Sequence, residues 1–211
     1  MRKKTLNAAT AVAAVLVLAA CSEAPKAPPA ATKAETEAKK EPPKPPEPIA
    51  AQSAFYEMYK PARAWAVDAV PLSLASEELP TLKNDGGKAA KWTAVFVSTS
   101  RREARTFSYA VADAAGTLKG VTIGGAEPWS GATPKSRPFQ TGEFLINSDA
   151  AYQTAYEKAQ AWVKKHPDKK CSLFLGNAAR FPSPVWFIIW GNTKSGYAVY
   201  VNATTGKALT K

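Results

Sequence analysis

The sequence has few of the residues that most often carry catalysis or bind metals. Its 211 residues include one histidine, His166, and two cysteines, Cys21 and Cys171. Two cysteines are too few for a disulfide framework, and one histidine excludes a histidine-rich metal site. A nucleophile–base pair of Cys171 and His166 is one hypothesis, but Cys171 alternates with Leu173 and Leu175, which favours a place in the core. We therefore expect no enzyme, no cofactor and no metal.

Aromatic residues are missing from residues 22–50, where Ile49 is the one large aliphatic side chain. Lysine and glutamate balance each other there, and eight prolines interrupt them. Such a segment cannot bury enough apolar area to offset its chain entropy, and its prolines favour an extended spacer. We expect residues 21–50 to form a disordered tether, with a proline-rich ligand for a recognition domain as the alternative.

The apolar run at the N-terminus, residues 5–20, is too short to span a bilayer comfortably as a helix. It follows Arg2-Lys-Lys4 and closes on Leu18-Ala-Ala-Cys21, which resembles a bacterial lipobox. The resemblance implies a signal peptide over 1–20 and palmitate-type acyl chains at Cys21, which would hold the chain firmly on a membrane. An ordinary signal peptide and an uncleaved anchor are the alternatives. Ser22 resembles the sorting pattern for the outer membrane, facing the periplasm.

Acidic residues are scarce relative to basic ones, and the formal net charge is +11. Removal of residues 1–20 would take away three basic residues and leave +8. Two basic clusters are candidate sites for an anionic polymer or lipid headgroups, with a solvated surface as the alternative. They consist of Arg101, Arg102 and Arg105, and of Lys164, Lys165, Lys169 and Lys170. We expect no nucleic-acid partner for an exported protein.

The rest of the chain appears in two similar parts. Residues 52–68 and 148–165 both carry apolar residues at helical spacing and share the pattern Ala-x-Ala-Trp. The same five features follow the helix in each part, in the same order. They are a short alternating segment, a Trp-led strand, a polar loop, a second strand and a glycine. The pattern predicts one unit over 51–125, a connector over 126–143 and a second unit over 144–211. One mixed α+β domain is the alternative.

The last part of the second unit resembles a PepSY module. The resemblance is carried by the helix, by Trp186–Trp190 and by the ending Tyr-Ala-Val-Tyr-Val-Asn-Ala-Thr-Thr-Gly-Lys over 197–207. It is weaker over 52–120, although only that copy has an acidic residue, Asp113, before the final glycine. The resemblance implies an α+β fold of two cystatin-like units, each with one helix on an antiparallel sheet. It also implies a non-enzymatic envelope module, for which peptidase inhibition is one suggested role.

Both faces of the strand Trp186–Trp190 are apolar, so both faces need a cover. One hypothesis is that the two units pack against each other as two layers of one core. The other is an apolar face of Trp186, Ile188 and Trp190 that binds an envelope protein or peptide. We therefore expect a membrane-anchored binding or inhibitory protein, with a basic component that binds anionic polymer or lipid as the alternative.

Overall fold

The computed structural model describes residues 44–192 and 194–209. The predicted signal peptide, Cys21 and most of the predicted tether lie outside these residues. Pro43–Lys211 form one compact unit, and Ile49 already belongs to it because it forms a bridge with Ala89. Among the described residues, the helices are too short or too polar to cross a membrane.

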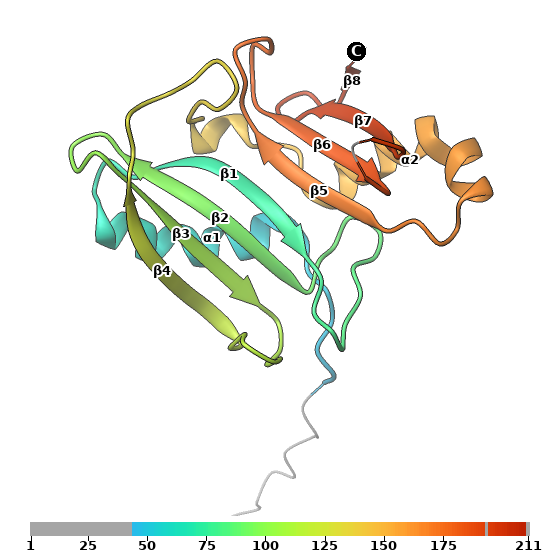
Figure 1. The fold of residues 1–211 in the computed structure, drawn as a ribbon, viewed down its shortest axis with the longest axis horizontal. Helices are drawn as coiled ribbons and strands as arrows, with labels where there is room; N and C mark the ends of the chain where they lie inside the picture. Colours follow the sequence, from blue (N-terminus) through green and yellow to red (C-terminus); the bar gives the residue numbers. More distant parts are fainter. Residues whose placement is uncertain (1–43, 193, 210–211) are drawn as a thin grey trace, which may run out of the picture. The chain divides into compact units, whose positions relative to one another are not determined.

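One antiparallel sheet of eight strands dominates this unit (Figure 1). The strand order is β4-β3-β2-β1-β5-β6-β7-β8. The strands are β1 (Val70–Glu77), β2 (Lys91–Ser98), β3 (Glu103–Ala110), β4 (Gly120–Pro128), β5 (Cys171–Gly176), β6 (Val185–Trp190), β7 (Tyr197–Asn202) and β8 (Ala208–Leu209). The helices are α1 (Ala51–Trp65), the short 3₁₀ helix η1 (Thr141–Glu143) and α2 (Ser148–Lys165).

The predicted fold class of two units, each with one helix on its own sheet, is wrong. The two parts of the chain share one mostly β architecture, because β1 pairs with β5 and joins their strands into a single sheet. Each of these strands would otherwise be an edge with unpaired backbone groups, and their pairing removes both edges. The predicted face-to-face packing of the units is wrong for the same reason, since the two parts lie side by side.

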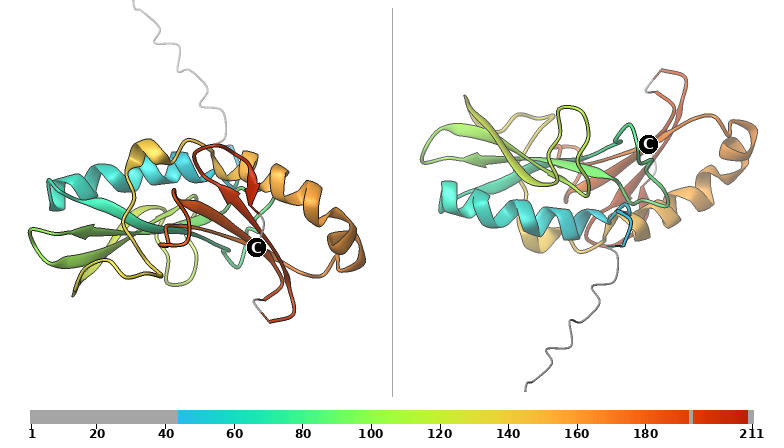
Figure 2. Two further views of the ribbon diagram at one scale, coloured as in Figure 1. Left: turned by 90° about the horizontal axis from the view of Figure 1, so that it is seen from above. Right: turned by 90° about the horizontal axis from the view of Figure 1, so that it is seen from below.

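Both helices cover the same face of the sheet (Figure 2). α1 packs on β2 and β3, and α2 packs on β6 and β7. The core between them contains two fully buried tryptophans, Trp92 of β2 and Trp186 of β6, whose rings are 6.2 Å apart. Their indole N–H groups donate to the carbonyls of Ile49 and Ile146, each shortly before a helix, at 2.9 Å. Each Trp-led strand therefore holds the backbone just before the first turn of a helix.

The N-termini of the two helices meet. The Ser148 hydroxyl accepts a hydrogen bond from the Ala51 amide at 2.9 Å, and the Asn147 side chain accepts one from the Gln52 amide at 3.0 Å. These bonds satisfy two of the amides that a helix start leaves without a partner. The N-cap of α2 is Asn147, and the Ser148 hydroxyl accepts its hydrogen bond from the start of α1.

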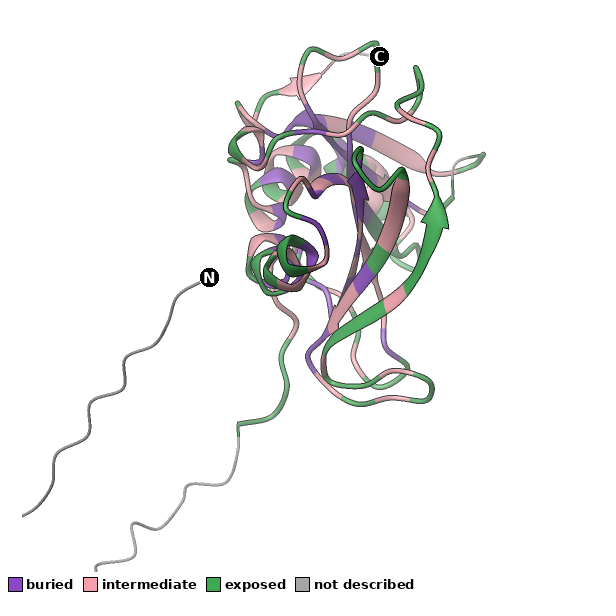
Figure 3. Cartoon of the chain, turned by 90° about the vertical axis from the view of Figure 1, so that its left-hand side faces the viewer, coloured by how far each residue is buried: buried purple, intermediate pink, exposed green. Residues whose placement is uncertain are grey.

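The sheet extends beyond α1 at one edge. β4 is mostly exposed along its length (Figure 3), including the side chains of Val121 and Ile123. The other edge is the two-residue strand β8, which pairs with Tyr200 and Val201 of β7. Neither edge borders the cavity described next, which lies where β1 and β5 separate.

Candidate ligand pocket

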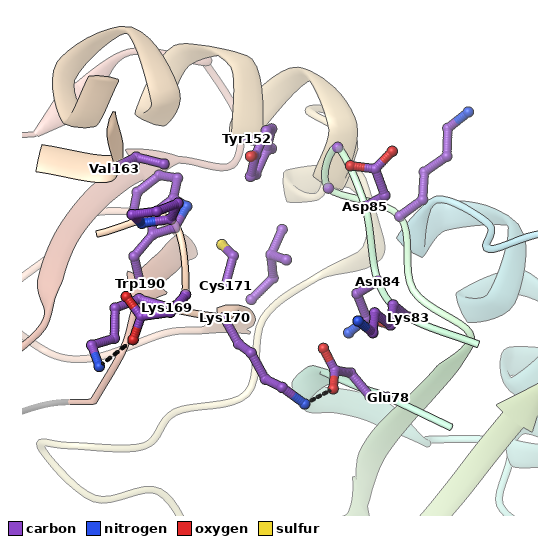
Figure 4. Close-up of a pocket in the computed structure, with 16 residues that line it drawn as sticks. Glu78, Lys83, Asn84, Asp85, Tyr152, Val163, Lys169, Lys170, Cys171 and Trp190 are labelled. Atoms are coloured by element: carbon purple, nitrogen blue, oxygen red, sulfur yellow. Dashed lines mark hydrogen bonds and ion pairs between the residues drawn. The ribbon is translucent and has the colours of Figure 1, made fainter. Parts of the chain in front are cut away.

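A cavity of about 440 Å³ opens where the strands β1 and β5 diverge. These strands pair only over Ser73–Ala75 and Phe174–Gly176. At the next step the Leu173 amide donates to the Ser76 hydroxyl at 2.9 Å instead of continuing the ladder. The segment that links β1 to β2 fills one side of the resulting gap, and α2 closes the other (Figure 4).

The cavity has an apolar interior and a charged rim. Tyr152 and Val163 of α2, Cys171 and Leu173 of β5, and Trp190 of β6 form the interior. The charged residues of the rim are Glu78, Lys83, Asp85, Lys88, Asp168, Lys169 and Lys170. The apolar interior can take an uncharged side chain, and the charged rim can pair with an ionic group beside it.

A tight turn at residues 85–88 forms the wall next to α2. Asp85 and Lys88 exchange two backbone hydrogen bonds of 3.0 and 2.7 Å, and both residues between them are glycines with positive φ. A Cβ on Gly87 would lie 2.5 Å from the Ser148 carbonyl oxygen and 2.7 Å from Cβ of Tyr152. Only glycine therefore lets this turn lie directly on the first turn of α2.

Ion pairs neutralise some of the charged side chains on the rim. The Lys170 ammonium contacts Glu78, and the Lys169 ammonium lies 2.8 Å from Asp168 (Figure 4). Lys83 and Lys88 are exposed and form no ion pair with any residue in the described ranges. With Asp85 as the one rim acid outside the two pairs, the mouth of the cavity carries an excess of positive charge.

The interior disfavours charge. Burial raises the pKa of the Cys171 thiol to about 12, and burial likewise raises the pKa of the Tyr152 hydroxyl. Both groups are therefore neutral at physiological pH. Cys171 does not pair with His166, whose Nδ1 contacts the Trp162 carbonyl at 2.9 Å and whose ring stacks on Trp162 at 4.1 Å. Cys171 is therefore a neutral thiol without a histidine partner.

The structure separates the two predicted basic clusters. Arg101, Arg102 and Arg105 belong to the β2–β3 hairpin, and the lysine cluster belongs to the end of α2 and the start of β5, at the opposite end of the sheet (Figure 1). Only Lys169 and Lys170 of the lysine cluster line the cavity. Lys164 and Lys165 are exposed on the last turn of α2.

The predicted apolar face of Trp186, Ile188 and Trp190 is not on the surface. The exposed fractions of these side chains are 0%, 0% and 2%, because they point toward α2. Trp190 still takes part in the candidate site as a wall of the cavity. The residues that sequence reasoning missed are Tyr152 and the turn Asp85–Lys88. The pair Gly86-Gly87 is typical of a turn, but nothing in the sequence indicates that this turn lies on α2.

The arginine cluster is held by an aromatic ring and by backbone. The guanidinium carbons of Arg101 and Arg105 each lie 5.9 Å from the centre of the Trp65 ring. The Arg105 Nε also donates to the Gly124 carbonyl at 2.9 Å. Asp68 shapes the hairpin tip, and hydrogen bonds from the Ser98 hydroxyl and the Ser100 amide lower its pKa to about 2.

Comparison with known proteins gives little that bears on function. No family model matches the chain, and no curated protein matches it. One solved structure is similar, that of a "putative lipoprotein" from Clostridium difficile 630, with a TM-score of 0.43 and 10% sequence identity. The match covers 74% of this chain and 90% of that one. The resemblance to PepSY modules therefore remains a prediction from the sequence.

Proposed function

We propose that this protein is a lipid-anchored envelope protein that binds a peptide segment without catalysing a reaction. The observation that carries the proposal is the cavity between β1, β5 and α2, which combines an apolar interior with a positively charged mouth. Inhibition of a peptidase is one form that such binding could take, as the PepSY resemblance implies. The anchor would be Cys21, and the location would be the outer membrane, facing the periplasm.

The lining of the cavity suits one apolar side chain. Tyr152, Val163 and Cys171 are partly exposed and offer aromatic and apolar surface, with Trp190 and Leu173 buried behind them. Burial of an apolar side chain against this surface removes it from water. A buried charge would be unfavourable there, since the interior already raises the pKa of Cys171 and Tyr152. The ligand group that enters the cavity is therefore uncharged, such as the side chain of Phe or Leu.

The rim suits a carboxylate beside that side chain. Glu78 and Asp168 already pair with lysines, whereas Lys83 and Lys88 have no ionic partner among the residues that the structure describes. A peptide C-terminus places a carboxylate next to an apolar side chain. We therefore infer that the segment bound here ends in an apolar residue with a free carboxylate.

Peptide binding tests this proposal directly. Hexapeptides that end in Phe or Leu would be compared, as free acids and as C-terminal amides, by calorimetry with the chain from residue 22 onward. The free acids should bind more tightly, and Lys83→Glu with Lys88→Glu should weaken binding about tenfold, because two rim charges are reversed. Lys207→Glu, on the turn before β8, is the control. No binding by any peptide, or equal weakening by the control, contradicts the proposal.

Membrane attachment is tested separately. Cys21→Ala should release the protein from membranes, because no acyl chain could then be added to the sulfur. The measurement is the fraction of protein that sediments with the membranes after cell lysis. Continued tight membrane association of the Cys21→Ala chain contradicts anchoring through this residue.

A second candidate function is binding of an anionic polymer at the β2–β3 hairpin. The specific observation is that Trp65 holds the guanidinium groups of Arg101 and Arg105 in place, which reduces the entropy lost on binding. Arg101→Glu with Arg102→Glu should weaken retention on immobilised polyphosphate, and salt should weaken it steeply. Retention equal to that of a Lys60→Glu, Arg63→Glu control rejects this site.

A further inference from the structure

One face of the sheet carries no helix (Figure 2). A row of aromatic side chains lies on that face, because the alternate residues of β5 and β6 are buried on the helix side. Phe174 of β5 faces Phe187 of β6, which faces Tyr200 of β7. The ring centres are 5.8 and 5.1 Å apart. Phe181, from the loop after β5, packs on Phe187 at 6.1 Å and on Tyr200 at 6.2 Å. We refer to Phe174, Phe181, Phe187 and Tyr200 as the aromatic row.

The aromatic row is only partly buried. Phe174 is 42% exposed, and the other three side chains are of intermediate exposure. The neighbouring residues on the same strands, including Leu173, Trp186 and Ile188, point the other way and are buried under α2. The row is therefore not part of the core that holds the helices.

Basic side chains flank the row on two sides. The Arg180 guanidinium carbon lies 4.5 Å from the centre of the Phe181 ring and 5.3 Å from that of Tyr200. Lys135 lines a small hollow together with Phe174 and Phe187. Its segment is fixed to the loop after β5, because the Ala179 amide donates to the Pro134 carbonyl at 2.8 Å.

Acidic residues are absent from the segments that carry the aromatic row and its flanking cations. Residues 128–142 and 169–211 contain no Asp or Glu, although the chain as a whole has 17. The segments do contain Lys135, Arg137 and Arg180, all of which are exposed. An anionic partner would therefore meet no repulsive charge from these segments.

We propose that the aromatic row and its flanking cations form a surface that rests on an anionic lipid bilayer. Aromatic rings with a partly exposed edge and long basic side chains are the groups enriched where proteins meet the membrane interface. Anionic lipids attract basic residues within a Debye length of the surface. The proposal goes beyond peptide binding in the cavity, and vesicles that contain no peptide test it independently.

The proposed surface would give the anchored protein a fixed orientation. A proline-rich tether extends by up to roughly 3 Å per residue, so it would reach the membrane without deciding which face turns toward it. Contact through the aromatic row would turn the helix-covered face, with α1 and α2, away from the lipid (Figure 2).

Vesicle binding by the unlipidated chain from residue 22 onward tests the proposal. The probes are vesicles of phosphatidylcholine alone and of phosphatidylcholine with phosphatidylglycerol, and the readout is co-sedimentation. Each basic residue near an anionic surface contributes about fivefold to partitioning. Arg180→Glu removes one attraction and adds one repulsion, so it should lower partitioning about 25-fold on the anionic vesicles.

Two matched controls separate this surface from general effects. Arg63→Glu changes the net charge equally on the exposed face of α1, and Tyr56→Ser removes an aromatic that is 50% exposed there. Phe174→Ser should weaken partitioning several-fold, whereas both controls should leave it nearly unchanged. Failure of the chain to bind anionic vesicles overturns the proposal. Equal losses from Arg63→Glu and Arg180→Glu overturn it as well, because net charge alone would then explain binding.

Discussion

Replacement of Gly87 by alanine adds one methyl group to the wall of the cavity. We expect it to destabilise the protein more than the same replacement at any other glycine of this wall. The native φ of +82° is a left-handed conformation that costs a residue with a Cβ about 1–2 kcal/mol. The new Cβ would also lie within 2.7 Å of three atoms of α2, two of them backbone atoms. Overpacking of this kind typically costs about 1–3 kcal/mol. We therefore expect a loss of roughly 2–5 kcal/mol in the free energy of unfolding.

Gly86 provides a control for the conformational cost of a positive φ, because it carries that cost without the steric overlap. Its φ is +53°, but a Cβ there would meet no atom within 4 Å. Gly86→Ala should therefore lose only the conformational part, about 1–2 kcal/mol. Urea denaturation of both variants measures the difference. Equal losses would refute the conclusion that the turn 85–88 lies directly on α2, and with it the closed wall of the cavity.

Three further predictions concern the core, the β2–β3 hairpin and the cavity. Trp186→Ala should lower the free energy of unfolding by about 3–5 kcal/mol. Trp162→Ala should lower it by less, because the Trp186 ring is fully buried and the Trp162 ring only partly. Equal losses for the two variants in urea denaturation would contradict this. The pKa of Asp68 is lowered to about 2, so its stabilising effect is complete above its ordinary pKa of 3.8 and is lost as the pH falls toward 2. Asp68→Asn should flatten the pH dependence of unfolding in this range, and an unchanged slope would count against the hydrogen bonds from Ser98 and Ser100. Burial raises the pKa of Cys171 to about 12, so iodoacetamide should label the native chain from residue 22 much more slowly than the urea-unfolded chain; similar rates would place the thiol in water.

The local elements could be predicted from the sequence because their signals are local. The apolar spacing predicted a helix over 148–165, and α2 spans Ser148–Lys165. The short alternating segments form β1 and β5, the Trp-led strands form β2 and β6, and the second strands form β3 and β7. α1 ends at Trp65, three residues before the predicted end, and continues through Pro61. These elements follow from periodicity and turn residues, which need no knowledge of the partner strand.

The joining of the two parts could not be predicted because it depends on which strands pair. Val70–Leu74 and Cys171–Leu175 alternate in the same way, and that pattern does not state that β1 and β5 are neighbours. Similarly, Trp186 and Phe187 are both apolar, so the sequence alone does not decide which of them faces α2. The cavity arises where β1 and β5 separate, so it could not be predicted without knowing that these strands pair.

The most direct test of the proposed function is an amide NMR titration of the chain from residue 22 with a hexapeptide that ends in Phe as a free acid. Binding in the cavity should shift the signals of residues 83–88 and of Cys171, together with the Trp190 indole N–H, and leave the β2–β3 hairpin unchanged. The absence of shifts, or shifts centred on Arg101 and Arg105 instead, would contradict a ligand pocket between β1, β5 and α2.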